Sequence, residues 1–378
     1  VTLLRVHDAL SEVLSETQTQ VMRVQCQENI ENSWDGRSLK LNQQFLENQE
    51  SRHSLQRELE VLKPALPSIP DSSPSFTHSP SKKVLFFESL MNSDMEYNDA
   101  EMSQGVLHMV SSIDHLGVEP IFARVKMPIE GDTRPVQGLD QLSDVLSGNQ
   151  ISLVCISLLE GYWDGVIKLI ARLRELGCSA RIAVGGVMPT LTPEHVAAHL
   201  PDVSFICRGA GEYFLPKIVQ ILGASNLDIP LSEDQLQAFA QMKGIIVRAE
   251  QNGQKILVTG RADQVVQVED LNQVALNLDY VQERHLVGGV EICTSRGCIH
   301  RCTFCNIIGR ESYQARSSEN TIQLLDRYHQ RYTALFGDRI PPNAWRLHIA
   351  DDDFACDKPR AAQFFQDLLK TPFRLSSV

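Results

Sequence analysis

Short apolar runs alternate with amphipathic segments throughout residues 83–225. The apolar runs read "KVLFFESL", "VEPIFARV", "ISLVCISL", "ARIAVGG" and "VSFICRG". Each is followed by apolar residues at helical spacing, as in "YWDGVIKLIARLRELG". Strands that are apolar on both faces and alternate with helices are typical of a parallel sheet covered on both sides. The pattern therefore predicts an α/β fold with a doubly wound parallel sheet, and a ligand site over the carboxyl ends of its strands.

The residues before this region follow two other patterns. Residues 1–63 are polar and free of proline, with apolar residues at helical spacing, which predicts two amphipathic helices separated at "ENSWDGRS". We expect a loosely attached helical extension, and the alternative is that these helices contact a partner. Residues 64–82 are rich in proline and serine, which is typical of a linker without a core.

A connector and a second β/α series follow the first sheet. We expect residues 226–284 to form a connector that contains a β-hairpin, turning at Asn252-Gly253, or to hold the edge of the next domain. A further domain is expected over residues 285–378. Its strands are predicted in "GGVEICTS" and "WRLHIADDDF", and its helices in "NTIQLLDRYHQRY" and "KPRAAQFFQDLLK".

The amino-acid composition limits which binding partners and which cellular compartment we expect. The formal net charge of -12 over 378 residues argues against a nucleic-acid backbone or an anionic membrane as the main partner. No apolar run reaches the ~20 residues that span a bilayer, and the first residues lack a signal-peptide cleavage site. We therefore expect a cytoplasmic protein, in which clustered cysteines bind metal more often than they form disulfides.

Four of the nine cysteines fall within thirteen residues, at positions 293, 298, 302 and 305. A structural zinc site commonly uses two well-separated cysteine pairs, and no second pair or histidine pair follows here. Cys293 lies in a predicted strand and is interpreted as a buried strand cysteine. Three thiolates in one loop favour an iron–sulfur cluster, since soft ligands select such clusters and a missing fourth ligand leaves one iron open.

The spacing Cys298-x3-Cys302-x2-Cys305, with the aromatic Phe304 before the last cysteine, resembles the signature of the radical S-adenosylmethionine (SAM) superfamily. The resemblance implies that these three cysteines bind a 4Fe-4S cluster whose open iron chelates the amine and carboxylate of SAM. Phe304 would then lie beside these cofactors. One electron, supplied by a donor of the flavodoxin or ferredoxin type, would cleave SAM to a 5′-deoxyadenosyl radical. The protein would orient the cofactors and exclude water.

The acidic run in "LHIADDDF" resembles the second barrel strand of the cobalamin-dependent branch of that superfamily. The resemblance implies that one of Asp351, Asp352 and Asp353 accepts a hydrogen bond from the SAM amine. The alternative is that these carboxylates cap the following helix, where negative charge is favourable.

The upstream α/β region resembles a cobalamin-binding domain. Ser157-Leu158-Leu159 resembles the Ser-x-Leu motif of that family, and Gly185-Gly186 resembles its Gly-Gly motif. "RGAGE" ends at Glu212 and opens a helix whose backbone amides would take polar groups of the cofactor. The cofactor-binding residues implied by the resemblance are Ser157, Leu159, Gly185, Gly186, Gly209, Gly211 and Glu212. The loop after the first strand lacks the family's Asp-x-His-x-x-Gly motif, so no protein imidazole is expected on the cobalt, and His115 is interpreted as a helix-capping residue.

The resemblance implies a cobalamin-dependent radical SAM enzyme that methylates an unactivated carbon, or phosphorus, of a small-molecule or natural-product substrate. Ring formation or rearrangement within the same branch is the first alternative. The second is a cofactor-binding protein without turnover, because about six β/α units make such a partial barrel and about two follow the predicted hairpin. The expected (β/α) partial barrel is thus incomplete, and the sequence does not identify the substrate.

Overall fold

The computed structural model describes residues 82–88, 103–128, 135–223, 230–251, 253–260, 265–286, 289–300, 302–305, 307–308, 312–337, 345–371 and 375–377. All of them belong to one unit, Phe76–Val378. The helical extension predicted for residues 1–63 lies outside the described residues, as does the predicted linker except for its last residue.

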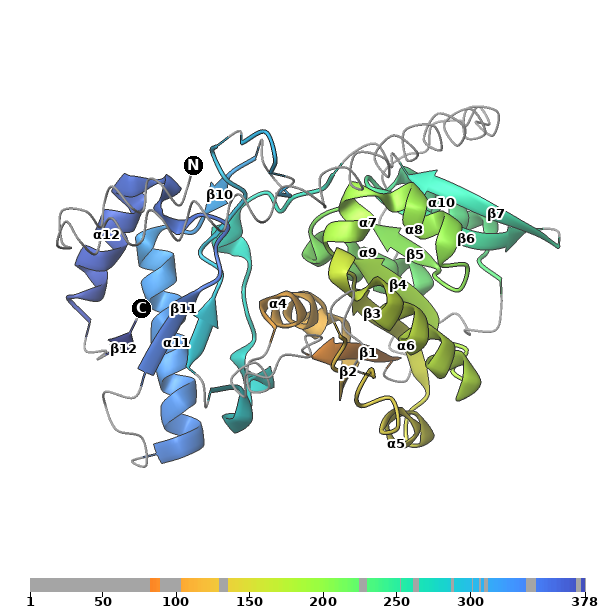
Figure 1. Cartoon of the computed structure of the whole chain (residues 1–378), viewed down its shortest axis with the longest axis horizontal. Helices are drawn as coiled ribbons and strands as arrows, with labels where there is room; N and C mark the ends of the chain where they lie inside the picture. The colour runs from red at the N-terminus through yellow and green to blue at the C-terminus, as the bar shows by residue number, and fades with distance from the viewer. Residues whose placement is uncertain are drawn as a thin grey trace, which may run out of the picture. The chain divides into compact units, whose positions relative to one another are not determined.

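Seven strands form the main sheet (Figure 1). They are β1 (Lys82–Glu88), β2 (Val118–Arg124), β3 (Ile151–Ser157), β4 (Arg181–Gly185), β5 (Phe205–Cys207), β6 (Ile245–Gln251) and β7 (Gln254–Gly260). Their order is β2-β1-β3-β4-β5-β6-β7. The first five strands are parallel, and β6 and β7 are antiparallel to their neighbours. The predicted α/β class and mostly parallel sheet are confirmed, and the strand order reverses between β1 and β3, where such sheets bind ligands.

Helices cover both faces of this sheet. They are α4 (Gln104–Ile113), α5 (Leu142–Ser147), α6 (Trp163–Glu175), α7 (Val187–Leu191), α8 (Pro193–His199), α9 (Gly211–Leu222) and α10 (Glu233–Gln241). Val84 and Phe86 of β1 are buried in one apolar cluster with α4, α9 and α10. Leu85 and Phe87 are buried in a second cluster with α5, α6 and α8. Alternation along a strand that is apolar on both faces therefore builds two core layers.

The β6–β7 hairpin extends the main sheet, so its predicted place in a connector or at the edge of the next domain is wrong (Figure 1). Val247 pairs with Phe205 of β5, and Ile245, Ile246 and Val247 are all buried. A strand that is apolar on both faces requires cover on both faces, which the main sheet and its helices provide. Helix α10, just before the hairpin, was not predicted.

A smaller parallel sheet follows, in the order β12-β11-β8. Its strands are β8 (Val290–Ile292), β11 (Trp345–Ile349) and β12 (Leu375–Ser377), and its helices are α11 (Ser318–Phe336) and α12 (Lys358–Leu368). The third parallel strand, β12, adds to the two that the sequence predicted. Two further short strands, β9 (Ser295–Arg296) and β10 (Gln314–Ala315), pair with each other in antiparallel fashion.

Short 3-10 turns complete the described elements. They are η2 (Asp114–Leu116), η3 (Glu160–Tyr162), η4 (Leu271–Gln273), η5 (Leu278–Tyr280), η6 (Glu283–Leu286) and η8 (Phe354–Cys356). Val290 and Ile292 of β8 share the apolar cluster of α4 and α9, and the side chain of Gln104 donates to the carbonyl of Glu291 at 2.6 Å. Strand β8, which leads into the cysteine-bearing segment, is thereby packed against α4.

Candidate functional site

The three cysteines predicted as cluster ligands lie in one loop that follows β8 and β9. Cys298 is buried, whereas Cys302 and Cys305 are half-buried, and all three are free thiols. The amide of Cys305 donates to the carbonyl of Cys302 at 3.1 Å, which closes a turn. Burial raises the pKa of Cys298, and the nearby Asp353, Cys356 and Cys302 raise it further. A cation or cluster that binds here would relieve this repulsion between anions.

The chain that enters this loop is fixed by Asp351, at the end of β11. One carboxylate oxygen accepts from the backbone amides of Thr294 and Ser295, at 2.6 and 2.9 Å. The other accepts from the hydroxyls of the same two residues, at 2.5 and 2.7 Å, and lies 3.4 Å from Arg360. Since the Asp351 side chain is 0% exposed and both oxygens are occupied, it is ill suited to bind the SAM amine.

Asp352 and Asp353 make fewer hydrogen bonds within the protein than Asp351 does, so their carboxylates have more capacity to accept from a ligand. Asp352 accepts from the amide of Gly297 at 2.9 Å, and burial followed by the neighbouring Asp351 raises its pKa even though this hydrogen bond lowers it. Asp353 lies 3.6 Å from the Nε2 of His300. Helix α12 is capped instead by Asp357, which accepts from the amide of Arg360 at 3.2 Å. The alternative that the three aspartates cap this helix is therefore wrong.

Arg296, two residues before Cys298, forms an ion pair with Glu212 at the start of α9. Its Nη2 lies 2.5 Å from Glu212 Oε1, and its Nη1 lies 3.3 Å from Oε2. His108 of α4 lies 2.8 Å from the same Oε1 through its Nδ1. The same Nδ1 lies 3.0 Å from Nη2 of Arg296, so this ring nitrogen faces both an acceptor and a donor. Three elements distant in sequence thus converge on one carboxylate.

The charges in this network are strongly coupled. Burial by itself raises the pKa of Glu212, but the hydrogen bond from His108 and the charge of Arg296 outweigh burial and hold the pKa well below its usual range. Burial lowers the pKa of His108, and its interactions with Glu212 only partly offset this effect. At neutral pH the network consists of an ionised Glu212, a charged Arg296 and a neutral His108.

Cys298, His300 and Asp353 form a compact group of potential metal ligands. One ligand atom from each lies within 4.8 Å of the others. Among the described residues, Cys302 and Cys305 do not belong to this compact group. A structural zinc ion takes four ligands, so the compact group would need one more from outside it.

Two further residues of the cysteine segment, Cys293 and Phe304, have different exposures to solvent. Cys293 follows β8, is half-buried and donates to the carbonyl of Ser295 at 3.3 Å. Burial raises its pKa. It was expected as a buried strand cysteine, and it lies instead one residue beyond the strand because the chain turns toward Asp351 at Thr294. Phe304 is 76% exposed, so an aromatic surface is available beside the cysteine loop.

The predicted Ser-x-Leu and Gly-Gly motifs lie side by side at the carboxyl ends of β3 and β4. Ser157 pairs with Gly185, and the amide of Leu158 donates to the carbonyl of Gly185 at 2.8 Å. Gly186 has a φ of 99°, and a Cβ there would lie 2.9 Å from Ser157 Oγ. A Cβ at Gly185 would meet no heavy atom within 4 Å among the described residues. Leu159, two residues after Ser157, is 37% exposed.

The "RGAGE" segment is held mainly by the chain itself. The amide of Gly209 donates to Thr190 Oγ1 at 3.0 Å, and the amide of Ala210 donates to the carbonyl of Val266 at 2.8 Å. Gly209 has a φ of 119°, and a Cβ there would lie 1.9 Å from the carbonyl oxygen of Val266. Gly211 is likewise crowded, because a Cβ would lie 2.9 Å from the Met109 side chain. These glycines have a packing role that is independent of any cofactor.

Comparison with known proteins adds one relative. No family model matches the chain. A stretch of 154 residues is 29% identical to the anaerobic magnesium-protoporphyrin IX monomethyl ester cyclase of Synechocystis sp.. The chain is a distant relative of that cyclase. The match covers 40% of this chain and only 27% of the cyclase, so the chain spans a minor part of its relative's length. In the described part of the chain, no helix has the length and apolar character that crossing a bilayer requires.

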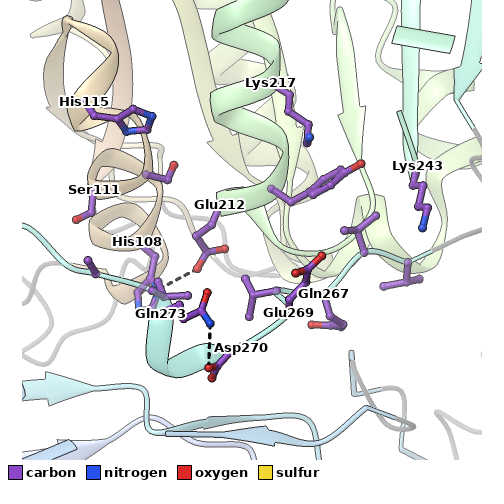
Figure 2. A pocket seen from close by; sticks show the side chains of 17 residues that line it. His108, Ser111, His115, Glu212, Lys217, Lys243, Gln267, Glu269, Asp270 and Gln273 are labelled. Carbon is purple, nitrogen blue, oxygen red and sulfur yellow. Dashed lines mark hydrogen bonds and ion pairs between the residues drawn. The ribbon is translucent and has the colours of Figure 1, made fainter. Parts of the chain in front are cut away.

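A cavity of about 750 Å³ lies against α4 and α9 (Figure 2). Its lining includes His108, Glu212, Lys217 and Lys243, and the segment Val265–Asp270 borders it. Figure 2 shows the contact between His108 and Glu212 at its edge. None of the three predicted cluster cysteines lines it, so the cavity is separate from the cysteine loop.

Sequence reasoning missed Arg296, His108 and His300. Their partners lie 84, 104 and 53 positions away in the sequence for Arg296–Glu212, His108–Glu212 and His300–Asp353. The one local signal was that Arg296 and His300 lie within two residues of a predicted ligand, Cys298. For His108, in the middle of an amphipathic helix, no sequence signal existed.

Proposed function

We propose that this chain is the part of a radical SAM enzyme that binds the cluster, with a 4Fe-4S cluster held by Cys298, Cys302 and Cys305. The observation that carries the proposal is the loop that holds all three thiols after the first strand of a parallel β/α series. The distant kinship with an anaerobic cyclase supports it. When bound, the cluster supplies the electron that cleaves SAM reductively.

The residues around the loop fit this role. Thr294 to Gly297 are held by carboxylates before the first cysteine, so the loop is oriented without the metal. Asp353, at the edge of the loop, is the best placed of the three aspartates to accept from the SAM amine, because its contact with His300 is long and partly exposed. Phe304 is free to cover the cofactors from the solvent side.

The substrate-level reaction is proposed more broadly. A relative that is a cyclase favours ring formation, and methylation of an unactivated carbon or phosphorus is the second candidate, supported by the motifs at the ends of β3 and β4. Both reactions require a small-molecule substrate and an electron donor of the flavodoxin or ferredoxin type. The expected cellular compartment is the cytoplasm, whose reducing conditions keep the thiols free.

We include cobalamin in the proposal as a ligand of the first sheet. The support is that a Cβ at Gly185 would meet no heavy atom of the described residues within 4 Å and that Leu159 on the neighbouring strand end is exposed, which leaves room for a ligand at these strand ends. Gly185→Ala places a methyl group in that space without a clash in the cofactor-free protein. We expect it to weaken hydroxocobalamin binding about tenfold in an absorbance titration. Gly148→Ala, at the end of α5 and also without close contacts, is the matched control.

The deciding experiment is electron paramagnetic resonance (EPR) of anaerobically reconstituted, dithionite-reduced protein, recorded with and without SAM. We expect a 4Fe-4S signal that shifts when SAM is added and that is lost in Cys302→Ala. A cluster signal indifferent to SAM would mean that the chain holds iron without binding the co-substrate. Stoichiometric zinc in place of a cluster would refute the proposal.

A further inference from the structure

Four consecutive residues before the first cysteine are each fixed by a carboxylate. Asp351 binds Thr294 and Ser295, Glu212 binds Arg296, and Asp352 binds Gly297. Asp351 and Asp352 follow β11 of the small sheet, whereas Glu212 begins α9 of the main sheet. The path of the chain into Cys298 is therefore determined from two sheets.

The contact between Glu212 and Arg296 constrains the direction of the Arg296 side chain as well as its distance from Glu212. The Glu212 side chain is 10% exposed, and each of its oxygens faces one terminal nitrogen of Arg296. Such a two-point contact between a guanidinium and a carboxylate fixes orientation as well as distance. His108, 2% exposed, holds the same carboxylate from α4. These contacts constrain the direction of the Arg296 side chain, and Cys298 follows two residues later.

We propose that Glu212 is a positioning residue for the cysteine loop: it acts through Arg296 to set the orientation of Cys298 and hence of the cluster. The inference rests on the proposed function, because it concerns the same site. It assigns Glu212 a role different from the cofactor contact that its "RGAGE" motif suggested. It also makes α9 of the main sheet part of the support of a site in the small sheet.

Glu212→Gln tests the inference, because it removes the charge while nearly preserving the shape. Glu175→Gln is the matched control, since Glu175 forms an exposed 3.1 Å pair with Arg172 on α6. Each protein is reconstituted anaerobically, and iron release to a ferrous chelator is followed together with the EPR spectrum. We expect Glu212→Gln to release iron about tenfold faster than wild type and to show altered g-values in the presence of SAM. The control should match wild type in both.

A merely stabilising role would lower the unfolding midpoint of Glu212→Gln and leave its EPR spectrum unchanged, and that result would overturn the inference. The Glu212→Gln, Arg296→Gln double variant should release iron no faster than the faster single variant, because both lose the same contact; additive rates would also overturn it. Where Glu212→Gln does not fold, Arg296→Lys decides, because lysine keeps the positive charge but cannot form the two-point contact. We expect Arg296→Lys to release iron faster than wild type, and wild-type iron retention in this variant would contradict the inference.

This design separates two failures. If wild type and Glu175→Gln bind no cluster, the proposed function has failed. If both bind a SAM-responsive cluster and Glu212→Gln behaves identically, the proposed function stands and the positioning role is refuted.

Discussion

Asp351 accepts a hydrogen bond from the backbone amide of Thr294 at 2.6 Å, and this contact joins the end of β11 to the chain just beyond β8. The two strands are neighbours in the small sheet. Because the same carboxylate also takes the amide of Ser295 and both hydroxyls, a single buried charge fixes the turn into the cysteine loop. The contact exists within the protein alone, so its loss should be visible without any cofactor.

Asp351→Asn is therefore expected to destabilise the metal-free protein. Asparagine replaces one acceptor oxygen by a donor, which then faces the hydroxyl and Arg360 groups that bind there. Disrupting a buried, hydrogen-bonded charge costs about 3 kcal/mol of unfolding free energy. The measurement is urea unfolding of apoprotein. Asp353→Asn, at a partly exposed position, should stay within about 0.5 kcal/mol of wild type, and equal losses in both variants would contradict this account.

His300→Ala distinguishes the cluster from a single metal ion. In the cluster proposal His300 is not a ligand, so the variant should retain close to the wild-type iron content after anaerobic reconstitution. In the alternative, Cys298, His300 and Asp353 share one ion, and His300→Ala loses it. The check is metal analysis of this variant beside Cys302→Ala, which should lose iron. Loss of metal in His300→Ala together with full retention in Cys302→Ala would favour the single-ion site.

The sequence predicted the elements of the fold well where a local pattern sufficed. The five parallel strands and the helices between them follow from runs such as "ISLVCISL", in which both faces are apolar. Helix α10 was missed although its capping box, Ser232 with Gln235, is a local signal. The place of the β6–β7 hairpin was wrong because an apolar hairpin extends whichever sheet offers an edge, and local sequence does not say which.

The site divides in the same way. The cysteine spacing is local, and so the loop could be located in advance. Asp351, Asp352 and Asp353 have different roles because they contact different residues among 294–297, which lie more than 50 positions away in the sequence. Three identical side chains in a row give no local signal of this difference. The same holds for Glu212, whose motif suggested a cofactor but whose carboxylate meets Arg296.

Gly209→Ala should destabilise the cofactor-free protein strongly. Gly209 combines a φ of 119° with the carbonyl oxygen of Val266 at 1.9 Å from where a Cβ would lie, so both the backbone and a neighbour must move. Gly117→Ala is the control: its φ is 66°, but its Cβ would meet nothing within 4 Å. We expect about 1–2 kcal/mol for the control and clearly more for Gly209→Ala in urea unfolding. Equal losses of unfolding free energy in the two variants would mean that the backbone around Val266 moves aside at little cost.

Thiol reactivity should separate the cysteines of the apoprotein. Burial raises the pKa of Cys155 and of Cys207, and the thiolate is the reactive form. Cys302 and Cys305 are half-buried. Iodoacetamide followed by peptide mass spectrometry should therefore label Cys302 and Cys305 in the native protein, and Cys155 and Cys207 only in urea. Cluster reconstitution should protect Cys302 and Cys305, and labelling unaffected by reconstitution would count against their role as ligands.

The Glu212 network predicts a specific loss of stability in acid. The pKa of Glu212 is lower in the folded protein than in the unfolded chain, where a glutamate titrates near ~4.3. Below that pH the unfolded state binds more protons than the folded state, so the free energy of unfolding falls as the pH falls. His108 acts in the same direction from about pH 6.5 downward, because burial lowers its folded pKa. Urea unfolding of apoprotein between pH 7 and 3 measures the contributions of Glu212 and His108 together. Glu212→Gln should make the unfolding free energy depend less on pH below about pH 4.5. Parallel curves for wild type and variant would show that Glu212 is not held ionised by Arg296 and His108.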